Sequence, residues 1–385
     1  MRLITIAAFI LFSFTNIMAM GYSQLTVEEL RIDKAKSSMP EVIDRFEDNI
    51  AQFNSQLSQI KTDESLRRVV DIHANELWQK AVSAYSTHND FDDRPLYWAR
   101  LQMTRDLRLS KVFKTLNSKQ QEKLLWQLEL LSRGQKDIHF DKSSNKKILL
   151  TGFDPFFLDR NINQSNPSGV VAMALDGRVI TYNGITVEIE TLIVPVRFED
   201  FDKGMIEELL TPYFKNKSVD MVITVSMGRD DFDLERFPGR RRSAKAPGNL
   251  NIFTGATAEN PLVPRLKNHQ LEGPEFVEFS LPSSLMLKAN GDFNINDNHK
   301  VMTLNKTFSP DTLSELSEQV SVQGSGGGYL SNEISYRSLL LRDKYNPTLP
   351  VGHIHTPRFK GFDPEKTKKI IQQIQSMISM TLSTK

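Results

Sequence analysis

The run KILLTG at residues 147–152 marks the point where the sequence pattern of this chain changes. It is a short apolar stretch that ends in glycine, which is typical of a buried strand. Further strand-like runs follow at 187–194, 221–225 and 351–354. Apolar residues at helical spacing occur at 198–214, 330–342 and 364–380. Strands that alternate with helices predict a layered α/β domain, here residues 147–385, with a mainly parallel sheet.

The chain before this run is predicted to be helical. Thr26 is followed three residues later by Glu29, which is the pattern of a capping box at a helix start. Apolar residues then repeat at helical spacing in four segments: 42–60, 66–85, 96–109 and 120–131. Residues 22–140 therefore form a helical N-terminal domain, and the polar residues 141–146 are interpreted as a linker. Two domains fit a length of 385 residues.

The first 21 residues have the three-part pattern of a signal peptide: a positive charge at Arg2, an apolar run at 4–14, and small residues at Ala19 and Gly21. The alternative is a buried N-terminal helix. The apolar run is too short for a stable membrane anchor, and no later stretch reaches 18 apolar residues. We therefore expect an exported protein, periplasmic or extracellular, without a membrane anchor once the signal is removed.

The amino-acid composition limits which partners the chain binds through overall charge and which nucleophiles it can use. The 48 basic and 47 acidic residues give a net charge of +1, so nothing in the overall charge favours nucleic acid. The chain has no cysteine, which rules out disulfides and a cysteine-linked lipid. Any covalent catalysis must therefore use an oxygen nucleophile. Oligomeric state is left open.

Three sequence features follow strands that should end at one edge of the sheet. They are residues 152–156, residues 226–236 and His355. Ligands bind at this edge in open α/β sheets. The run GGGYLSN at 326–332, which precedes the helical pattern, lies 24 positions before His355, counted from Ser331. It lacks the Lys-Ser/Thr ending of a phosphate loop, so its glycines are interpreted as a tight turn or an oxyanion-binding backbone.

These segments resemble the pyroglutamyl peptidase I (pyrrolidone-carboxylate peptidase) family. LLTGFDPF at 149–156 is similar to the opening motif of that family. The other matching segments follow in the family's order: 166–167, 194–195, 234–236, 246–249, 273–274, 281–282, 327–340 and 352–357. The resemblance covers residues 147 to about 380. It implies a three-layer α/β/α fold with an open, mainly parallel, twisted sheet, preceded here by a helical extension.

The resemblance also implies a site. The family removes an N-terminal pyroglutamate from peptides with a Glu, a Cys and a His and needs no cofactor, and the matching positions are Glu235, Ser331 and His355. A serine stands where the family has its cysteine, and its hydroxyl must lose a proton as it attacks. The apolar positions that hold the pyrrolidone ring correspond to four residues: Phe153, Phe156, Tyr329 and Leu330. Met227 stands about where the family has a Gln that binds the lactam.

Each of these residues also has a purely structural interpretation. Ser331 is a suitable helix cap, Glu235 is suited to a surface ion pair with Arg236, and His355 to a hydrogen-bonded core position. The four apolar residues suit core packing. His353 and His355 form a His-x-His pair that could bind zinc, but no third ligand has suitable spacing, so we expect no metal.

The basic run at Arg236, 240–242 and Lys245 either favours an acidic substrate or is a solvated loop. Lys245 also replaces an Arg of the family, which is not an equivalent donor. The first hypothesis is therefore an exported peptidase that acts on pyroglutamyl or related peptides. The second is a catalytically silent relative that binds peptides or partners. The third is a hydrolase with the same triad and a changed substrate, suggested by Met227 and Lys245.

Overall fold

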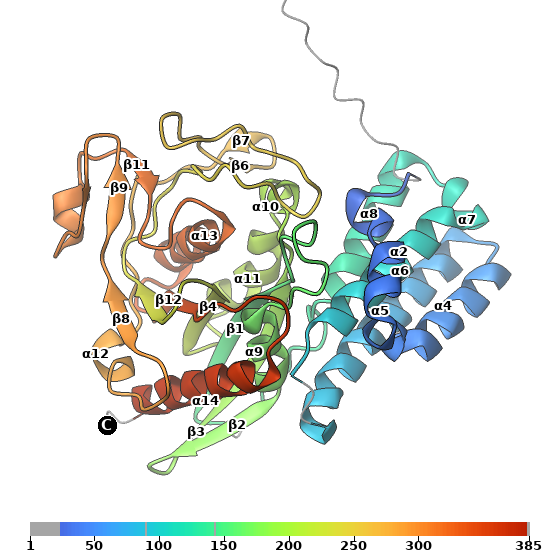
Figure 1. The fold of residues 1–385 in the computed structure, drawn as a ribbon, viewed down its shortest axis with the longest axis horizontal. Coiled ribbons are helices and arrows are strands. Elements are labelled where there is room, and N and C mark those ends of the chain that lie inside the picture. Colours follow the sequence, from blue (N-terminus) through green and yellow to red (C-terminus); the bar gives the residue numbers. More distant parts are fainter. Residues whose placement is uncertain (1–23, 89–90, 142–143, 383–385) are drawn as a thin grey trace, which may run out of the picture.

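The computed structural model describes residues 24–88, 91–141 and 144–382 (Figure 1). The predicted signal peptide lies outside these residues. The first described part is helical and forms one side of the molecule in Figure 1. Its helices are α1 (Val27–Leu30), α2 (Ile32–Ser38), α3 (Pro40–Ile43), η1 (Asp44–Phe46), α4 (Glu47–Gln59), α5 (Asp63–His88), α6 (Arg94–Leu109), α7 (Lys111–Lys114) and α8 (Ser118–Leu131). The prediction of a helical N-terminal region is confirmed.

Local sequence explains where several of these helices begin. The capping box at Thr26 is present, since its hydroxyl accepts from the Glu29 amide while the Glu29 carboxylate accepts from the Thr26 amide. Asn117 and Gln120 cap α8 in the same way. The apolar pattern at 42–60 is divided among α3, η1 and α4 instead of forming one helix. The long helix α5 packs against α4, α6 and α8 and buries Trp78 in their shared core.

The second part is built on a seven-stranded sheet in the order β2-β3-β1-β4-β12-β5-β8. Its strands are β1 (Lys146–Phe153), β2 (Arg178–Tyr182), β3 (Ile185–Val194), β4 (Met221–Met227), β5 (Phe232–Glu235), β8 (Ile295–Asn298) and β12 (Val351–Thr356). The four central strands β3, β1, β4 and β12 are parallel, while β2 and β5 run antiparallel to their inner neighbours and β8 is parallel to β5. The predicted mainly parallel sheet is confirmed.

Helices cover both faces of this sheet and make three layers. Helix α9 (Pro167–Leu175) packs on β1, β3 and β4, with α14 (Pro364–Thr381) beside it. Helices α11 (Met205–Lys215) and α13 (Leu330–Tyr345) pack together, and α13 contacts β4 and β12 on the other face (Figure 1). The single helix predicted at 198–214 is wrong in detail: Gly204, with φ of 92°, separates α10 (Phe198–Lys203) from α11.

Residues 250–323 contain only short elements. They are β6 (Arg265–Leu266), β7 (His269–Gln270), α12 (Ser283–Met286), β8, β9 (Val301–Thr303), β10 (Thr307–Phe308), η2 (Leu313–Leu316) and β11 (Ser321–Gln323). Strands β10, β9 and β11 form a small antiparallel sheet, and β6 pairs with β7. Strand β8 is the element in this segment that joins the main sheet.

Buried charges join the helical part to the sheet. Asp154, just after β1, contacts Arg100 of α6 at 2.9 Å and Arg133, just after α8, at 2.8 Å. All three side chains are at most 3% exposed. Asp93, before α6, accepts hydrogen bonds from the Ser165 hydroxyl at 2.6 Å and from the Asn166 amide. The loops at one end of the sheet are therefore held from the helical side.

A second set of buried charges reinforces this junction. Arg197, after β3, lies 2.7 Å from Glu28 and 2.9 Å from Glu129, which come from α1 and α8. The Tyr97 hydroxyl donates to Glu28 at 2.9 Å.

Within the described residues, every helix is too short or too polar to cross a membrane.

Candidate active site

A histidine and a glutamate from neighbouring strands meet at one edge of the sheet. His355 lies on β12 and Glu235 ends β5, and His355 Nδ1 is 2.5 Å from Glu235 Oε1. The glutamate is 1% exposed. A carboxylate only accepts hydrogen bonds, so Nδ1 donates to it, and in the neutral ring Nε2 is the nitrogen without a proton. Asn298 of β8 donates to Glu235 Oε2 at 2.8 Å and fixes the other oxygen. Glu235 is thus not in the surface ion pair with Arg236 that was the alternative.

Ser331 is the second residue of α13 and is half-buried. Tyr329, not Ser331, occupies the cap position, so the interpretation of Ser331 as the cap is wrong. The Ser331 hydroxyl donates to the Gly326 carbonyl at 3.3 Å. Within the described part of the chain, no hydrogen bond joins Ser331 to His355. Both residues and Glu235 nevertheless line one cavity, called here the central cleft.

Two glycines allow this close arrangement. Gly228 lies against His355: a Cβ atom there would stand 2.5 Å from the His355 Cβ, so only glycine fits. Gly327 has φ of 89° in the turn that is closed by the hydrogen bond from its amide to the Gly324 carbonyl. This turn places Gly326 beside both Ser331 and His355, as a Cβ on Gly326 would be 3.6 Å from His355 Cε1. The glycine run therefore forms a tight turn, one of the two roles expected for it.

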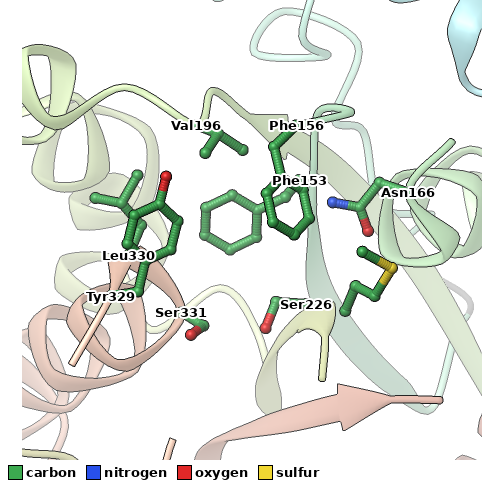
Figure 2. A pocket seen from close by; sticks show the side chains of 9 residues that line it. Phe153, Phe156, Asn166, Val196, Ser226, Tyr329, Leu330 and Ser331 are labelled. Atoms are coloured by element: carbon green, nitrogen blue, oxygen red, sulfur yellow. The ribbon is translucent and has the colours of Figure 1, made fainter. Parts of the chain in front are cut away.

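A small apolar pocket with a cavity volume of about 40 Å³ opens beside Ser331 (Figure 2). The structure brings together all five residues that the resemblance assigned to substrate binding: Phe153, Phe156, Met227, Tyr329 and Leu330. Figure 2 shows the two phenylalanines and Tyr329 with their rings around the pocket and the Ser331 and Ser226 hydroxyls below.

The pocket residues also belong to the core, so the two interpretations of them are compatible. Phe153 is buried and stacks on Phe201 with ring centroids 6.3 Å apart. The Tyr329 hydroxyl donates to the Pro247 carbonyl at 2.7 Å, and its ring meets Phe198 edge-on. Burial raises the pKa of Tyr329, so it remains a neutral donor. Phe153 and Tyr329 are thus held in the pocket wall by packing and by a hydrogen bond.

Three further residues line the pocket that sequence reasoning did not assign to it: Asn166, Val196 and Ser226. The Ser226 hydroxyl lies 2.7 Å from His353 Nε2, and His353 Nδ1 lies 2.8 Å from the Thr224 hydroxyl. Burial first, and the neighbouring His355 second, lower the pKa of His353 well below its usual value, so it is neutral. These hydrogen bonds could have been anticipated from the sequence, because Thr-x-Ser at 224–226 and His-x-His at 353–355 lie on strands that pair in this register.

Both ring nitrogens of His353 are occupied by hydroxyl groups, which does not suit a metal ligand. Among the residues that the structure describes, no group of three His, Cys, Asp or Glu side chains is arranged to hold a metal ion.

Most of the predicted basic run is structural. Arg236 pairs with Asp297, and Arg241 with Glu275 at 2.9 Å. Arg242 is buried and contacts Asp202 at 2.8 Å and Glu333 at 2.6 Å. These arginines are therefore neither a solvated loop nor a substrate-binding patch. Lys245 alone of the run stays exposed, 3.8 Å from an equally exposed Glu259.

Fold and site together define an α/β protein with a helical N-terminal region and a buried carboxylate–imidazole pair that lines one cleft with a serine. Family models for the PA0049 N-terminal domain and the PA0049 C-terminal domain match residues 15–129 and residues 147–280 and 288–360. The chain belongs to the PA0049 family.

A curated relative is the uncharacterized protein PA0049 of Pseudomonas aeruginosa, 30% identical over 355 residues. The match covers 70% of this chain and 64% of that protein, so the chain spans somewhat less than two thirds of its relative. Among solved structures, the pyrrolidone carboxyl peptidase of Pyrococcus furiosus is 21% identical, with a TM-score of 0.42, over 61% of this chain and 98% of that chain. The enzyme of Thermococcus litoralis is 18% identical, with a TM-score of 0.40, over 62% and 93%.

Proposed function

We propose that this protein is an exported hydrolase that removes an N-terminal pyroglutamyl or related group from peptides by acyl transfer to Ser331. The observation that carries the proposal is the Glu235–His355 hydrogen bond of 2.5 Å, in a cleft shared with Ser331. It is supported by the apolar pocket beside Ser331 and by the order of the family-like motifs. Export rests on the signal-like pattern of residues 1–21, and the peptide is the expected partner.

His355 acts as the general base in this mechanism. Its Nε2 takes the hydroxyl proton as Ser331 Oγ attacks the acyl carbon, and Glu235 stabilises the imidazolium through Nδ1–H. The same proton then passes to the leaving amine. Water attacks the acyl-serine in the second half, and its proton returns to Ser331 through His355. No cofactor takes part.

The oxyanion would form next to the N-terminus of α13. The first amides of a helix have no partner within it, and the positive end of its dipole favours negative charge. The side chain of Tyr329, the cap residue of this helix, makes no capping hydrogen bond within the described residues, and Tyr329 lines the same cavities as Ser331. For the reaction to begin, Ser331 must rotate away from the Gly326 carbonyl toward His355.

The test is hydrolysis of a pyroglutamyl-coupled fluorogenic amide by the mature protein. Turnover by the natural protein that is lost in Ser331→Ala and in His355→Gln is the expected result. If only Ser331→Cys turns over, the cleft is intact and naturally silent. Absence of turnover in all variants contradicts this substrate assignment and favours the related hydrolase with a changed substrate.

One observation favours the second function, a silent relative that binds peptide ends. The Ser331 hydroxyl is hydrogen-bonded to Gly326 and not to its prospective base. A binding protein would hold an uncleaved pyroglutamyl peptide equally well with serine or alanine at position 331. Calorimetric titration of both forms with the same peptide separates the two functions.

A further inference from the structure

The cavities around Ser331 adjoin one another, because neighbouring cavities share lining residues. The apolar pocket and the central cleft share Phe156, Met227, Tyr329 and Ser331. The central cleft in turn shares Phe157 and Ala246 with a third cavity, called here the side groove. A peptide whose acyl group lies in the apolar pocket at Ser331 thus has the central cleft next to it, and the side groove adjoins that cleft.

The side groove lies between the two parts of the chain. Arg31, at the junction of α1 and α2, lines it together with the 157–160 loop and the loop that begins at Lys245. The Arg31 guanidinium donates to both Asp159 oxygens at 2.6–2.7 Å and to the Asn249 carbonyl at 2.5 Å. This hydrogen bonding lowers the pKa of Asp159 to about 2, so the carboxylate stays ionised and the groove wall is formed in advance.

The charges along this path are strongly unequal. The lining residues of the three cavities include five cations, namely Arg31, Arg160, Arg229, Lys245 and Lys300, and two carboxylates, Asp159 and Glu235. The whole chain is almost balanced, at 48 basic and 47 acidic residues, so composition does not explain this excess. Asp159 is occupied by Arg31, and Asp233 neutralises Arg229 at 3.0 Å.

Three cations remain available to a ligand. Arg160 is exposed and stacks on Phe157, and Lys300 is exposed; within the described part of the chain neither has an ion-pair partner within 4 Å. Lys245 has only the distant contact with Glu259. Phe157 carries a positive φ of 60°, a strained conformation for a bulky residue, at the junction of the cleft and the groove.

We propose that the substrate is a peptide whose residues beyond the cleaved bond are acidic, and that this acidic chain lies in the side groove between the two domains. Arg160, Lys245 and Lys300 attract its carboxylates, while Arg31 supplies the wall from the helical region. The inference rests on the proposed function, which sets the direction in which the peptide runs along the cleft. It also gives the helical region a role in substrate binding.

The experiment compares two peptides of equal length, each with pyroglutamate followed by alanine, one continuing with Glu residues and the other with Lys residues. Exposed charge pairs are individually weak, and three of them together predict a preference for the acidic peptide of about 10-fold in kcat/KM. The difference should lie in KM and should decrease as salt shortens the screening length. Lys245→Glu should raise KM for the acidic peptide, whereas Lys61→Glu, at an exposed position outside all three cavities, should not.

Binding is measured in parallel, with labelled forms of both peptides and the Ser331→Ala variant, by fluorescence anisotropy. This readout does not require catalysis. Absence of cleavage combined with tighter binding of the acidic peptide would contradict the proposed reaction and support the acidic groove. Equal binding of the two peptides, or an unchanged KM in Lys245→Glu, overturns the inference even if both peptides are cleaved.

Discussion

Asp154 is the position where a single neutral substitution should most weaken the junction between the two parts of the chain. Its oxygens contact Arg100 at 2.9 Å and Arg133 at 2.8 Å. Arg133 has a second carboxylate partner, Glu129, at 2.8 Å. Arg100 has Asp154 as its carboxylate partner, together with the Ser132 hydroxyl and carbonyl. Asp154→Asn keeps the shape of the side chain and leaves the Arg100 guanidinium buried without a counter-charge.

The expected cost follows from burial. Arg100 is 1% exposed, so water cannot replace the lost partner. Breaking a buried ion pair by removing one member costs about 3–5 kcal/mol. Natural domains have a stability of about 5–15 kcal/mol, so the variant should remain folded under mild conditions with much of its margin removed. With a urea dependence of about 2–3 kcal/mol per M, the unfolding midpoint should fall by about 1–2.5 M.

The assay is urea unfolding followed by far-UV circular dichroism. Glu64→Gln is the control, because it breaks a pair with Arg68 in which both side chains are at least 74% exposed, and it should change stability by about 0.5 kcal/mol or less. A cycle with Arg100→Met supplies the decisive comparison. If Asp154→Asn costs about as much in the Arg100→Met background as in the natural chain, the two residues are not coupled and the reasoning is refuted.

Two other predictions concern the site and the pH dependence of stability. Gly228→Ala places a Cβ 2.5 Å from the His355 Cβ and should displace the imidazole. We expect kcat on a pyroglutamyl amide to fall by about 100-fold while circular dichroism still reports the native fold. Activity within a factor of two of the natural protein would contradict the assigned geometry. Burial raises the pKa of Glu190 from 4.5 to about 8, so the folded chain retains a proton that the unfolded chain releases, and stability should fall as pH rises through that interval. Glu190→Gln should flatten this dependence, which urea midpoints at about pH 5 and pH 8 would show.

The sequence predicted the central sheet well because its strands are apolar on both faces. β1, β3, β4 and β12 were all visible as apolar or β-branched runs, which is how strands covered by helices on both sides appear. β5 was not predicted as a strand. It has four residues, FDLE, and exists because it pairs with β12 on one side and β8 on the other. Such pairing is a tertiary effect that local pattern does not reveal.

Part of the candidate site could also be predicted from the order of the strands. Parallel strands end at one edge, so residues at the ends of β1, β4 and β12 had to converge there. The structure places Phe153, Met227 and His355 around two adjoining cavities. Asn298 could not be found in this way, because it lies in the irregular 250–323 segment and reaches Glu235 only through the β5–β8 pairing. The hydrogen bond from Ser331 to Gly326 likewise depends on the conformation of the glycine turn.

Helix α6 shows why the role of the helical region could not be predicted from the sequence. Its polar residues would be assigned to a solvent-facing side, yet Arg94, Arg100 and Gln102 are all buried. They are buried because acidic side chains and carbonyl groups from distant segments surround them, including Asp154 for Arg100.

The same buried contacts tie the helical region to the pocket. The Asp154 carbonyl accepts from the Asn166 side chain at 2.9 Å, and Asp93 accepts from the Asn166 amide, so a pocket residue is held through two groups that depend on the helical region. A chain reduced to residues 147–385 would expose Asp154 and Arg197, whose buried partners come from α1, α6 and α8 and from Arg133, two residues after α8. The pocket geometry therefore depends on the helical region. If the proposed activity is present in the whole chain, we expect it to be lost when the helical region is removed.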